Sequence, residues 1–401
     1  MNKLPSDWQI KTINEVCNIY TGNSINKKKK EENFIGLKEG LNYIGTKDIS
    51  FNNIIEYENG VKIPFKDLKD FKIAKSNTSL LCIEGGSAGR KIGFTNQDVC
   101  FGNKLCCFEA IEDEPKFIYF YLQSNDFLRE FNSNIQGLIG GVNKENLRKI
   151  KIPIPPLDEQ KRIASALSKI DAYLENTIKL IEEKERFKRG IAKKLLTCKE
   201  GENIPEARFK GFEDEWKIVK LKDMFDNFKE KNNEDKIILA STIDKGVVPN
   251  SLTERKIIRK KESLSNYKLV KKGCFVISLM SFQSGFEYSD YEGIISPAYT
   301  VLKPKIEMAH YFYKYYFKSF KFIKDLRPYA EGIRHGKQIK FKACKDILVP
   351  YPSIEEQEKI GGYLSLLDKE IDNLKKQKEL IKEMKKGAMQ KLLSGEVRLL
   401  E

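Results

Sequence analysis

One stretch of this sequence combines glycines with neighbouring cations, and residues of these types could bind a ligand. Gly85–Lys91 contains three glycines and ends in Arg90 and Lys91. The stretch lacks the G-x-x-x-x-G-K-[ST] spacing of a nucleotide-binding loop, and Ile92–Phe94 after it is typical of a strand instead of the helix that such a loop needs. A bent, basic turn can bring its backbone close to a nucleic-acid backbone. The stretch is therefore either a plain β-turn or a turn that contacts a nucleic acid.

Residues for catalysis by the chain itself are missing from the sequence. His310 and His335 are its two histidines, which excludes a His-rich metal site and disfavours a His-based triad. We find no Asp/Asn-Pro-Pro-aromatic motif of adenine methyltransferases, no glycine-rich cofactor motif after a strand, no nucleoside triphosphate site and no nuclease-like set of carboxylates and lysine. The eight cysteines form no C-x-x-C pair, which indicates buried reduced thiols. We predict a binding protein with no catalytic residue and no metal site.

The charge balance favours a polyanionic partner. The chain has 72 basic and 57 acidic residues, a net charge of +15, which suits DNA, RNA or an anionic membrane surface. A membrane is the weaker choice, because no apolar run approaches the roughly 18 residues needed to span one, and the sequence predicts a cytoplasmic protein without a signal peptide. The basic runs Lys27–Lys30 and Arg255–Lys261 are either solvated loops or DNA contacts.

A repeat with an offset of 197 residues organises the chain. Nine of the 22 positions are identical when Ile150–Asp171 is aligned with Ile347–Asp368. The two tryptophans, Trp8 and Trp216, begin similar segments and set the start of the second copy near Pro205. We therefore predict two copies of one module, each ending in a long helix.

Each copy begins with a mixed α+β domain. Short β-rich runs separated by turn residues predict strands in the first copy at Leu80–Ile83, Gly93–Thr95, Val99–Phe101 and Leu105–Phe108. Aromatic residues at helical spacing predict one core helix per copy, at Phe117–Phe131 and Tyr311–Leu326. The loops Gly137–Gly141 and Gly332–Gly336 share glycines at both ends and differ between them, as two copies with different ligands would.

Each copy ends in a helix of about 38 residues, or roughly 57 Å. Apolar residues at steps of three and four predict a heptad seam, whose members are Ile163, Leu167, Ile170, Leu174 and Ile181 in the first helix and Ile360, Leu364, Leu367, Ile371 and Leu374 in the second. The obvious partner for each seam is the other copy. Gly190 and Gly387 recur at one position of the two helices, which favours a close helix–helix approach or a partner contact over a tolerated defect.

The order of these elements is similar to that of a known family. Two unlike domains, each followed by a P-x-P-x-x-E-Q helix, with the junction R-F-x-G-F-x-x-E-W at Arg208–Trp216, resemble the specificity subunit of type I restriction–modification systems. The resemblance implies target-recognition domains at 1–152 and 201–349, each reading one half of a bipartite target in double-stranded DNA. It implies that the helical segments 153–200 and 350–401 pair as an antiparallel intramolecular coiled coil, act as a spacer and dock two methyltransferase subunits.

The resemblance also implies that the cofactors are held elsewhere. S-adenosylmethionine is expected on the methyltransferase subunits, and ATP and Mg²⁺ are expected on the partner subunits, among them the restriction subunits.

A tandem repeat with antiparallel helices acquires a pseudo-two-fold axis, which matches the local two-fold of B-DNA.

Base readout is predicted for loop residues whose side chains can reach major-groove edges. From position and chemistry these are Ser87, Arg90, Lys91, Asn103, Lys104 and Asn143 in the first copy and Gln283, Ser284, Tyr288, Arg334, His335 and Lys337 in the second. Two other interpretations stay open. One is the recognition half of a fused restriction–methylation enzyme, and the other is a coiled-coil adaptor that binds no nucleic acid, which would leave the net charge of +15 unexplained.

Overall fold

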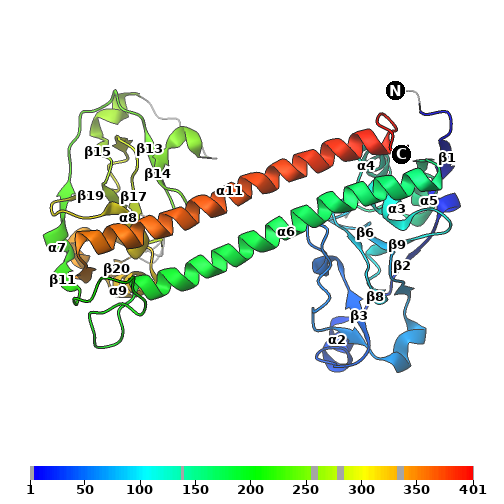
Figure 1. Cartoon of the computed structure of the whole chain (residues 1–401), viewed down its shortest axis with the longest axis horizontal. Helices are drawn as coiled ribbons and strands as arrows, with labels where there is room; N and C mark the ends of the chain where they lie inside the picture. The colour runs from blue at the N-terminus through cyan, green and yellow to red at the C-terminus, as the bar shows by residue number, and fades with distance from the viewer. Residues whose placement is uncertain (1–3, 137–139, 254–260, 278–283, 332–337, 401) are drawn as a thin grey trace. The chain divides into compact units, whose positions relative to one another are not determined.

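The computed structural model describes residues 4–136, 140–253, 261–277, 284–331 and 338–400 (Figure 1). The chain divides into two compact units. Unit 1 comprises residues 1–178 and 377–401, and unit 2 comprises residues 179–376. Two long helices, α6 (Leu157–Leu196) and α11 (Ile354–Leu393), each contribute one half to each unit. None of the described helices has the length and apolar character needed to cross a membrane.

Unit 1 is built on two four-stranded sheets. One is antiparallel, in the order β2-β9-β6-β7, and the other has the order β4-β3-β8-β5 with a parallel pair β3–β8. A separate antiparallel pair, β1 with β10, joins the start of the chain to the strand that leads into α6. The strands are β1 (Gln9–Thr12), β2 (Cys17–Thr21), β3 (Leu41–Ile44), β4 (Lys62–Ile63), β5 (Ile73–Ala74), β6 (Ser79–Cys82), β7 (Ile92–Phe94), β8 (Val99–Phe101), β9 (Leu105–Ala110) and β10 (Lys151–Ile154). The bounds of the four predicted strands differ by at most two residues from those of β6, β7, β8 and β9.

Unit 2 repeats part of this scaffold. Its four-stranded sheet has the order β12-β19-β16-β17, which is the topology of β2-β9-β6-β7, and β11 pairs with β22 as β1 pairs with β10. The strands are β11 (Lys217–Lys220), β12 (Phe225–Phe228), β13 (Leu239–Thr242), β14 (Gly246–Pro249), β15 (Lys268–Val270), β16 (Phe275–Ile277), β17 (Phe286–Tyr288), β18 (Gly293–Ile295), β19 (Thr300–Pro304), β20 (Ala330–Glu331), β21 (Gln338–Ile339) and β22 (Leu348–Tyr351). The remaining strands form two-stranded sheets β13-β14, β15-β18 and β20-β21, so the two copies differ around a shared centre.

Where the sequence predicts one aromatic helix per copy, the structure has two. In unit 1 these are α3 (Pro115–Tyr121) and α4 (Asn125–Ser133), and in unit 2 they are α8 (His310–Tyr316) and α9 (Phe320–Leu326). The break comes at a serine, because Ser124 Oγ accepts the Phe127 N–H at 3.2 Å and Ser319 Oγ accepts the Phe322 N–H at 3.3 Å. An N-cap of this kind starts a new helix. The aromatic spacing conceals the break, since both pieces bury aromatic rings in one core.

The remaining helices are short and flank the sheets. They are α1 (Ile13–Val16), α2 (Lys27–Asn33) and α5 (Lys144–Lys149) in unit 1, and α7 (Leu221–Met224) and α10 (Phe341–Cys344) in unit 2. The long helices α6 and α11 are 40 residues each. Each begins after a strand and a proline-containing segment, and carries two carboxylates in its first turn. Negative charges are stabilising there, because the N-terminus is the positive end of the helix dipole.

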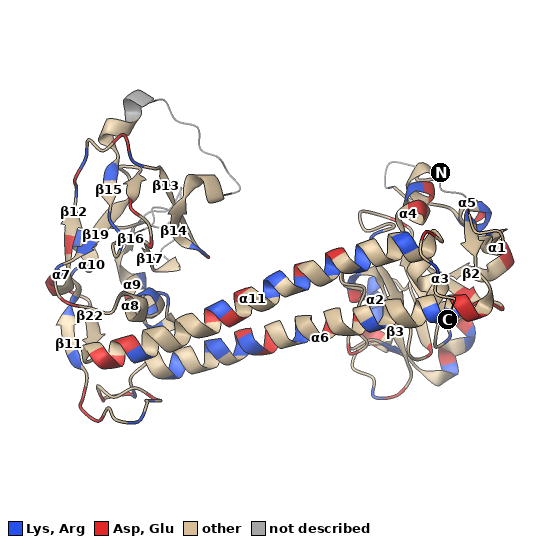
Figure 2. Cartoon of the chain, turned by 45° about the horizontal axis from the view of Figure 1, so that its top comes forward, with Lys and Arg blue, Asp and Glu red and all other residues tan. Residues whose placement is uncertain are grey.

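Within each unit the halves of α6 and α11 run antiparallel. In unit 2, Lys184 Nζ lies 2.6 Å from Glu370 Oε2 and Lys375 Nζ lies 2.7 Å from Glu185 Oε1. In unit 1, Lys385 Nζ of α11 lies 2.6 Å from Asp171 Oδ1 of α6. Figure 2 shows that basic and acidic residues are interspersed along the ribbons of both helices, as expected for the solvated flanks of a coiled coil.

Eight of the ten predicted seam residues are buried. Ile170 and Leu374 are partly exposed, and the buried ones are Ile163, Leu167, Leu174, Ile181, Ile360, Leu364, Leu367 and Ile371. The first turns of each helix also belong to a domain core, because Ile163 and Leu167 share a cluster with the aromatic residues of α3, and Ile360 and Leu364 with those of α8. The seam is therefore part helix–helix contact and part domain core.

The prediction that Gly190 and Gly387 mark a close approach of the chain's own helices is wrong. A Cβ built at either glycine meets no described atom within 4 Å. Both positions are exposed. The alternative that the same repeat position contacts a partner stays a prediction.

A buried glutamate at the start of each long helix ties that helix to its domain. Glu159 of α6 and Glu356 of α11 are each 1% exposed. Glu159 accepts the indole N–H of Trp8 at 3.1 Å, and Glu356 accepts that of Trp216 at 2.9 Å. Each glutamate also pairs with an arginine, as a buried carboxylate requires.

Candidate nucleic-acid interface

The Gly85–Lys91 stretch is the turn between β6 and β7 of unit 1. Gly89 has φ +70°, and its N–H donates to the Cys82 carbonyl at 2.8 Å. A Cβ at Gly89 would lie 3.0 Å from the ring of Phe131. Glycine is needed here for both backbone conformation and space, since the turn lies directly on α4. The turn connects two strands, β6 and β7, and leads into no helix, so it is not a nucleotide-binding loop.

The two cations of this turn lie over one exposed aromatic ring. The Arg90 guanidinium carbon is 5.5 Å from the centroid of Phe51, and Lys91 Nζ is 4.8 Å from it. Phe51 is 63% exposed. Lys91 Nζ also donates to the Thr46 carbonyl at 3.0 Å, and Arg90 donates to the Gly86 carbonyl. The contacts fix where these positive charges are presented.

Arg90 lines a cleft of about 400 Å³ in unit 1. Three other segments complete its wall: Phe51 and Asn53, the start of α4 from Gln123 to Leu128, and the last turns of α11 from Lys382 to Gln390. The cleft lining contains four cations, Arg90, Lys382, Lys385 and Lys386, and no carboxylate. We call it the basic cleft.

Three loops that carry predicted site residues meet beside the C-terminal end of β6 and the N-terminal end of β9. The Ile83 N–H donates to the Lys104 carbonyl at 3.0 Å, and the Val142 N–H donates to the Ile83 carbonyl at 3.0 Å. The structure thus brings Lys104 and Asn143 close to the turn that holds Ser87. Asn103 and Lys104 are exposed in the β8–β9 turn.

Several of these side chains already have partners. Lys104 Nζ lies 3.6 Å from a carboxylate oxygen of Glu84. Asn143 is the N-cap of α5, where its Oδ1 accepts the Asn146 N–H at 2.8 Å. Its amide nitrogen remains the group that could face a base. Ser87 is partly buried and its carbonyl accepts the Arg90 N–H at 3.0 Å.

The predicted readers of unit 2 fall largely outside the described residues. Gln283, Arg334, His335 and Lys337 lie there, as do residues 255–260 of the basic run. Ser284 and Tyr288 are described and buried, at 6% and 4% exposure.

The burial of Tyr288 differs from its predicted role as a base contact. Its ring packs between Phe275, at 5.3 Å, and His310, at 6.0 Å, and burial raises the pKa of its hydroxyl. Tyr288 belongs to β17, whose three residues are all buried. A tyrosine in this position cannot offer its hydroxyl to a base edge, so its role is packing.

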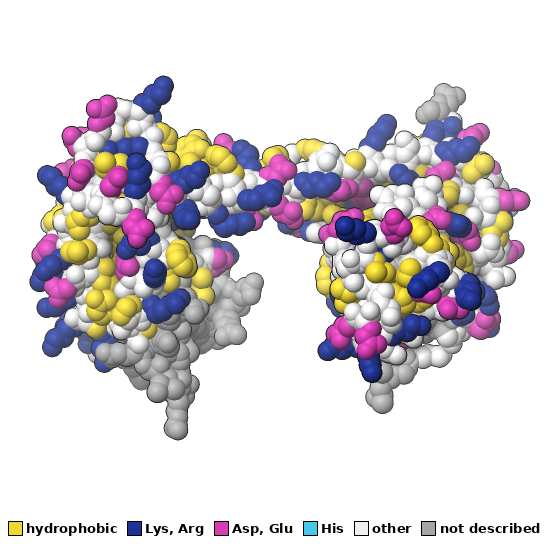
Figure 3. All heavy atoms as spheres, turned by 90° about the horizontal axis from the view of Figure 1, so that it is seen from below, with side chains coloured by type: hydrophobic (Ala, Val, Ile, Leu, Met, Phe, Trp, Pro, Cys, Tyr) yellow, Lys and Arg dark blue, Asp and Glu magenta, His cyan; other side chains and the backbone are white. Residues whose placement is uncertain are grey.

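Charged side chains are mixed over the surface. On the face seen in Figure 3, basic and acidic residues are interspersed with apolar patches in both units. The net positive charge therefore does not create one uniform face there, and local clusters such as the basic cleft decide where a polyanion would bind.

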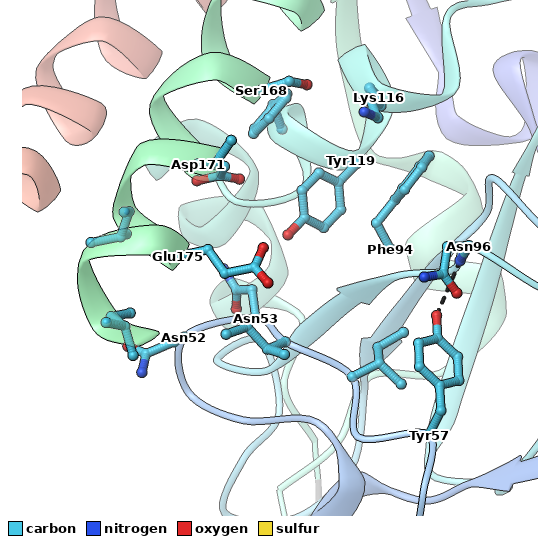
Figure 4. Close-up of a pocket in the computed structure, with 16 residues that line it drawn as sticks. Asn52, Asn53, Tyr57, Phe94, Asn96, Lys116, Tyr119, Ser168, Asp171 and Glu175 are labelled. Carbon is cyan, nitrogen blue, oxygen red and sulfur yellow. Dashed lines mark hydrogen bonds between the residues drawn. The ribbon is translucent and has the colours of Figure 1, made fainter. Parts of the chain in front are cut away.

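A second cavity, of about 450 Å³, lies in unit 1 between α6 and the first sheet (Figure 4). Asp171 and Glu175 of α6 line one side, and Phe94 and Tyr119 line the other. Ser168 Oγ is buried there without a hydrogen-bond partner among the described residues. With two carboxylates against the single cation Lys116, this cavity does not suit a polyanion.

Phe51, Asn53, Lys382 and Lys386 of the basic cleft are absent from the predicted site. The Lys-Lys-Gly sequence at 385–387 is visible as part of the repeat, but it has the composition of any solvated helix flank. Nothing in the sequence indicates that residues near 90 and near 386 share a cleft.

The comparisons with known proteins agree with this architecture. The sequence model of the type I restriction–modification DNA specificity domain matches residues 5–183 and 213–383. The MjaVIII type I restriction enzyme specificity subunit of Methanocaldococcus jannaschii is 26% identical, over 99% of this chain and 94% of its own length. The EcoBI specificity subunit of Escherichia coli is 21% identical, over 91% of this chain and 82% of its own.

Two solved structures share the fold. The S subunit of a type I restriction–modification system from M. genitalium has a TM-score of 0.59 at 17% identity, and covers 98% of this chain and 97% of its own. A chain solved in work on complex assembly of the type I system has a TM-score of 0.56 at 14% identity, and covers 99% of this chain and 100% of its own.

Proposed function

This chain belongs to the family of type I restriction–modification DNA specificity subunits, and we propose that each of its two units reads one element of a bipartite target in double-stranded DNA. On this proposal the recognition domains are residues 1–152 and 201–349. The loops of unit 1 around Arg90, Lys104 and Asn143 supply its contacts to bases and phosphates. The chain selects the DNA sequence and leaves the chemistry to its partners.

The observation that carries the proposal is a duplicated scaffold with unlike loops. The sheets β2-β9-β6-β7 and β12-β19-β16-β17 have one topology, and each unit closes its helix with a Trp–Glu–Arg cluster. Outside this scaffold the units diverge, since the second sheet of unit 1 has no four-stranded equivalent among the described residues of unit 2. A shared frame with different loops supports two readers of different sequences.

We further propose that α6 and α11 dock two methyltransferase subunits. Phe187 and Met384 occupy one repeat position (187 + 197 = 384), and their side chains are 53% and 52% exposed. An exposed glycine, Gly190 or Gly387, follows each of them one turn later. An apolar side chain beside a glycine suits a partner helix, and its occurrence twice suits two copies of one partner. S-adenosylmethionine would be held by those methyltransferase subunits, and ATP and Mg²⁺ by restriction subunits.

The test is a methylation map. The chain would be expressed with its methyltransferase subunits in a host that lacks adenine methylation, and modified adenines would be located by sequencing. We expect a motif of two short elements separated by a fixed number of unspecified base pairs. Replacing residues 1–152 with the same domain of another specificity subunit should change one element and keep the other. A single continuous motif, or methylation independent of sequence, would refute the proposal.

A further inference from the structure

We infer that the basic cleft of unit 1 binds a phosphate of the DNA backbone, so that the last turns of α11 are part of the DNA interface as well as a spacer. The inference rests on the proposed function and deepens it, because it assigns a sequence-independent contact to residues outside the recognition domain. It is carried by the charges of the cleft, by the absence of a partner for Lys386 among the described residues, and by comparison with the same place in unit 2.

The cleft presents positive charge that ion pairs among the described residues neutralise only in part. Its lining has four cations and no carboxylate. Lys385 is committed to structure, because it pairs with Asp171 at 2.6 Å and donates to Gln123 Oε1 at 3.1 Å. Lys386 has no partner among the described residues and is exposed. Arg90 uses one N–H on the Gly86 carbonyl, and the guanidinium has further donors for an anion.

Lys382 is positioned at the cleft without a role in pairing the helices. Its Nζ lies 3.4 Å from Glu379 Oε1, an exposed contact one turn away on the same helix. The equivalent residue of unit 2 (382 − 197 = 185) is Glu185, which pairs across the helices with Lys375 at 2.7 Å. The position of unit 1 that corresponds to Lys375 is Ile178 (375 − 197), which has no charge to offer. Helix pairing therefore does not explain a lysine at 382.

The neutral part of the lining also distinguishes unit 1 from unit 2. Asn125 at the start of α4 lines the cleft and is exposed. Aligning the two capping serines (319 − 124 = 195) places Phe320 at the equivalent site of unit 2. An amide beside lysines is a phosphate-contacting set, and a phenylalanine is not. The ion pairs shared by the copies, such as Lys385 with Asp171 and Lys188 with Asp368, are scaffold. Lys386 has a cationic counterpart in unit 2, Arg189 (386 − 197), whereas Lys382 and Asn125 are specific to unit 1.

A DNA phosphate fits the cleft better than a base or an acidic protein segment. Lysines and an arginine attract phosphate without regard to sequence. Arginine and lysine also donate to guanine in the major groove, but three lysines and an arginine gathered in one cleft favour a charged phosphate over a neutral base. The Gly85–Lys91 turn, which carries the proposed base contacts, adjoins the cleft through Arg90.

The experiment compares Lys382→Gln/Lys386→Gln with a matched control, Lys391→Gln. Lys391 is exposed on the same helix and lies outside the cleft lining. Each variant is assembled with the methyltransferase subunits. Binding to a duplex with the mapped target and to a scrambled duplex is measured by fluorescence anisotropy across a range of salt concentrations. Lys386→Gln alone provides a second variant that alters one exposed side chain, should the double variant unfold.

We expect the double variant to bind both duplexes more weakly by the same factor, about fivefold at 0.15 M salt for each phosphate that the cleft no longer neutralises. The slope of log affinity against log salt should become shallower by about 0.9 per phosphate. Lys391→Gln should match the wild type in both respects. The methylated sequence should not change, because the phosphate backbone is the same at every base.

Three results would overturn the inference. Unchanged affinity and slope in the double variant would show that the cleft is not on the DNA path. Weaker binding confined to the specific duplex would indicate a base contact. Loss of methyltransferase co-purification with unaltered DNA binding would assign the cleft to an acidic segment of that partner. Failure of the proposed function looks different, because the wild-type complex itself would then recognise no bipartite target.

Discussion

Arg398 and Glu159 form a two-pronged ion pair between residues 239 positions apart in the chain. Nε lies 2.7 Å from Oε1 and Nη2 lies 2.8 Å from Oε2. Arg208 makes the same pair with Glu356 in unit 2, with both distances 2.8 Å. The Arg398 side chain also reaches Asp7 at 2.6 Å, and its hydrogen bonds hold the pKa of the Asp7 carboxyl below its usual range. The glutamate in the first turn of each long helix is therefore paired with an arginine that follows the other long helix in the sequence.

Arg398→Gln should destabilise unit 1. The substitution leaves the buried Glu159 carboxylate with the Trp8 indole as its remaining side-chain partner, and an uncompensated buried charge costs about 3 kcal/mol. Calorimetry should show a lower transition temperature for one unit, and Arg208→Gln should lower the other transition. Glu396→Gln, two residues from Arg398 and exposed, is the control. Melting of Arg398→Gln at the control temperature would contradict the role given to this pair.

A hydroxyl that contacts the long helix α11 in unit 2 has no counterpart at the equivalent position of unit 1. Tyr315 donates to Asp368 Oδ2 at 2.6 Å, whereas unit 1 has Phe120 at the equivalent position (315 − 195) beside Asp171. Tyr315→Phe should reduce the free energy of unfolding by about 1–2 kcal/mol. Phe120→Tyr should raise it by about 1 kcal/mol, because the new hydroxyl can meet Asp171 and Ser168 Oγ, which has no hydrogen-bond partner among the described residues. Urea titrations measure both, and a destabilised Phe120→Tyr would show that the junction has no room for the hydroxyl.

Acid should weaken unit 2 through His310. Burial lowers the pKa of this imidazole, although Asp290 opposes the shift, and Nδ1 has no hydrogen-bond partner among the described residues. The folded state thus takes up its proton at a lower pH than the unfolded state does. Stability should fall as the pH drops below the unfolded value of about 6.5, until the folded group also protonates. Urea midpoints at several pH values test this.

The histidine substitutions separate that effect from general acid sensitivity. His310→Phe keeps an aromatic ring against Tyr288 and should flatten the pH dependence between about pH 5.5 and 7. His335→Asn removes the other histidine and should leave the dependence as it is in the wild type. Equal pH slopes in all three proteins would exclude His310 as the cause.

Helix length should set the distance between the two target elements. Deleting the equivalent residues 175–181 and 372–378 removes one heptad from each long helix and shortens it by about 10 Å. The methylated motif should keep both elements and lose about three base pairs between them, at roughly 3.4 Å per pair. Deleting the heptad from α6 alone mismatches the seams and should abolish methylation. An unaltered spacing after the double deletion would show that helix length does not set the distance between the two target elements.

The sequence predicted the features that repeat and missed those that depend on burial. The 197-residue offset aligned Glu159 with Glu356, yet both appear as surface glutamates in the first turn of a helix. Their burial depends on Trp8, Trp216 and two distant arginines, which no local pattern connects. Similarly, the break at Ser124 is hidden because aromatic spacing continues through it.

The candidate site was harder to predict than the fold for the same reason. The turn at Arg90 was identified from local composition, because glycines and cations adjoin in the sequence. Lys386 was not, since its neighbours in the cleft come from residues near 51 and 124. The sequence places Tyr288 in a loop, but it lies in strand β17, which follows Gly285, a glycine with φ +68°.

Arg398, near the end of the sequence, pairs with the buried glutamate of unit 1, and Arg208, in the middle of the sequence, pairs with that of unit 2. Described residues from near both ends of the sequence meet in unit 1, where Arg398 pairs with Asp7 at 2.6 Å. Each unit therefore contains both members of its own arginine–glutamate pair. A rearranged gene running from residue 205 to 401 and then from 1 to 204 would encode every pairing described above. Gene shuffling could thus reverse the order of the two readers on the polypeptide without redesigning either one.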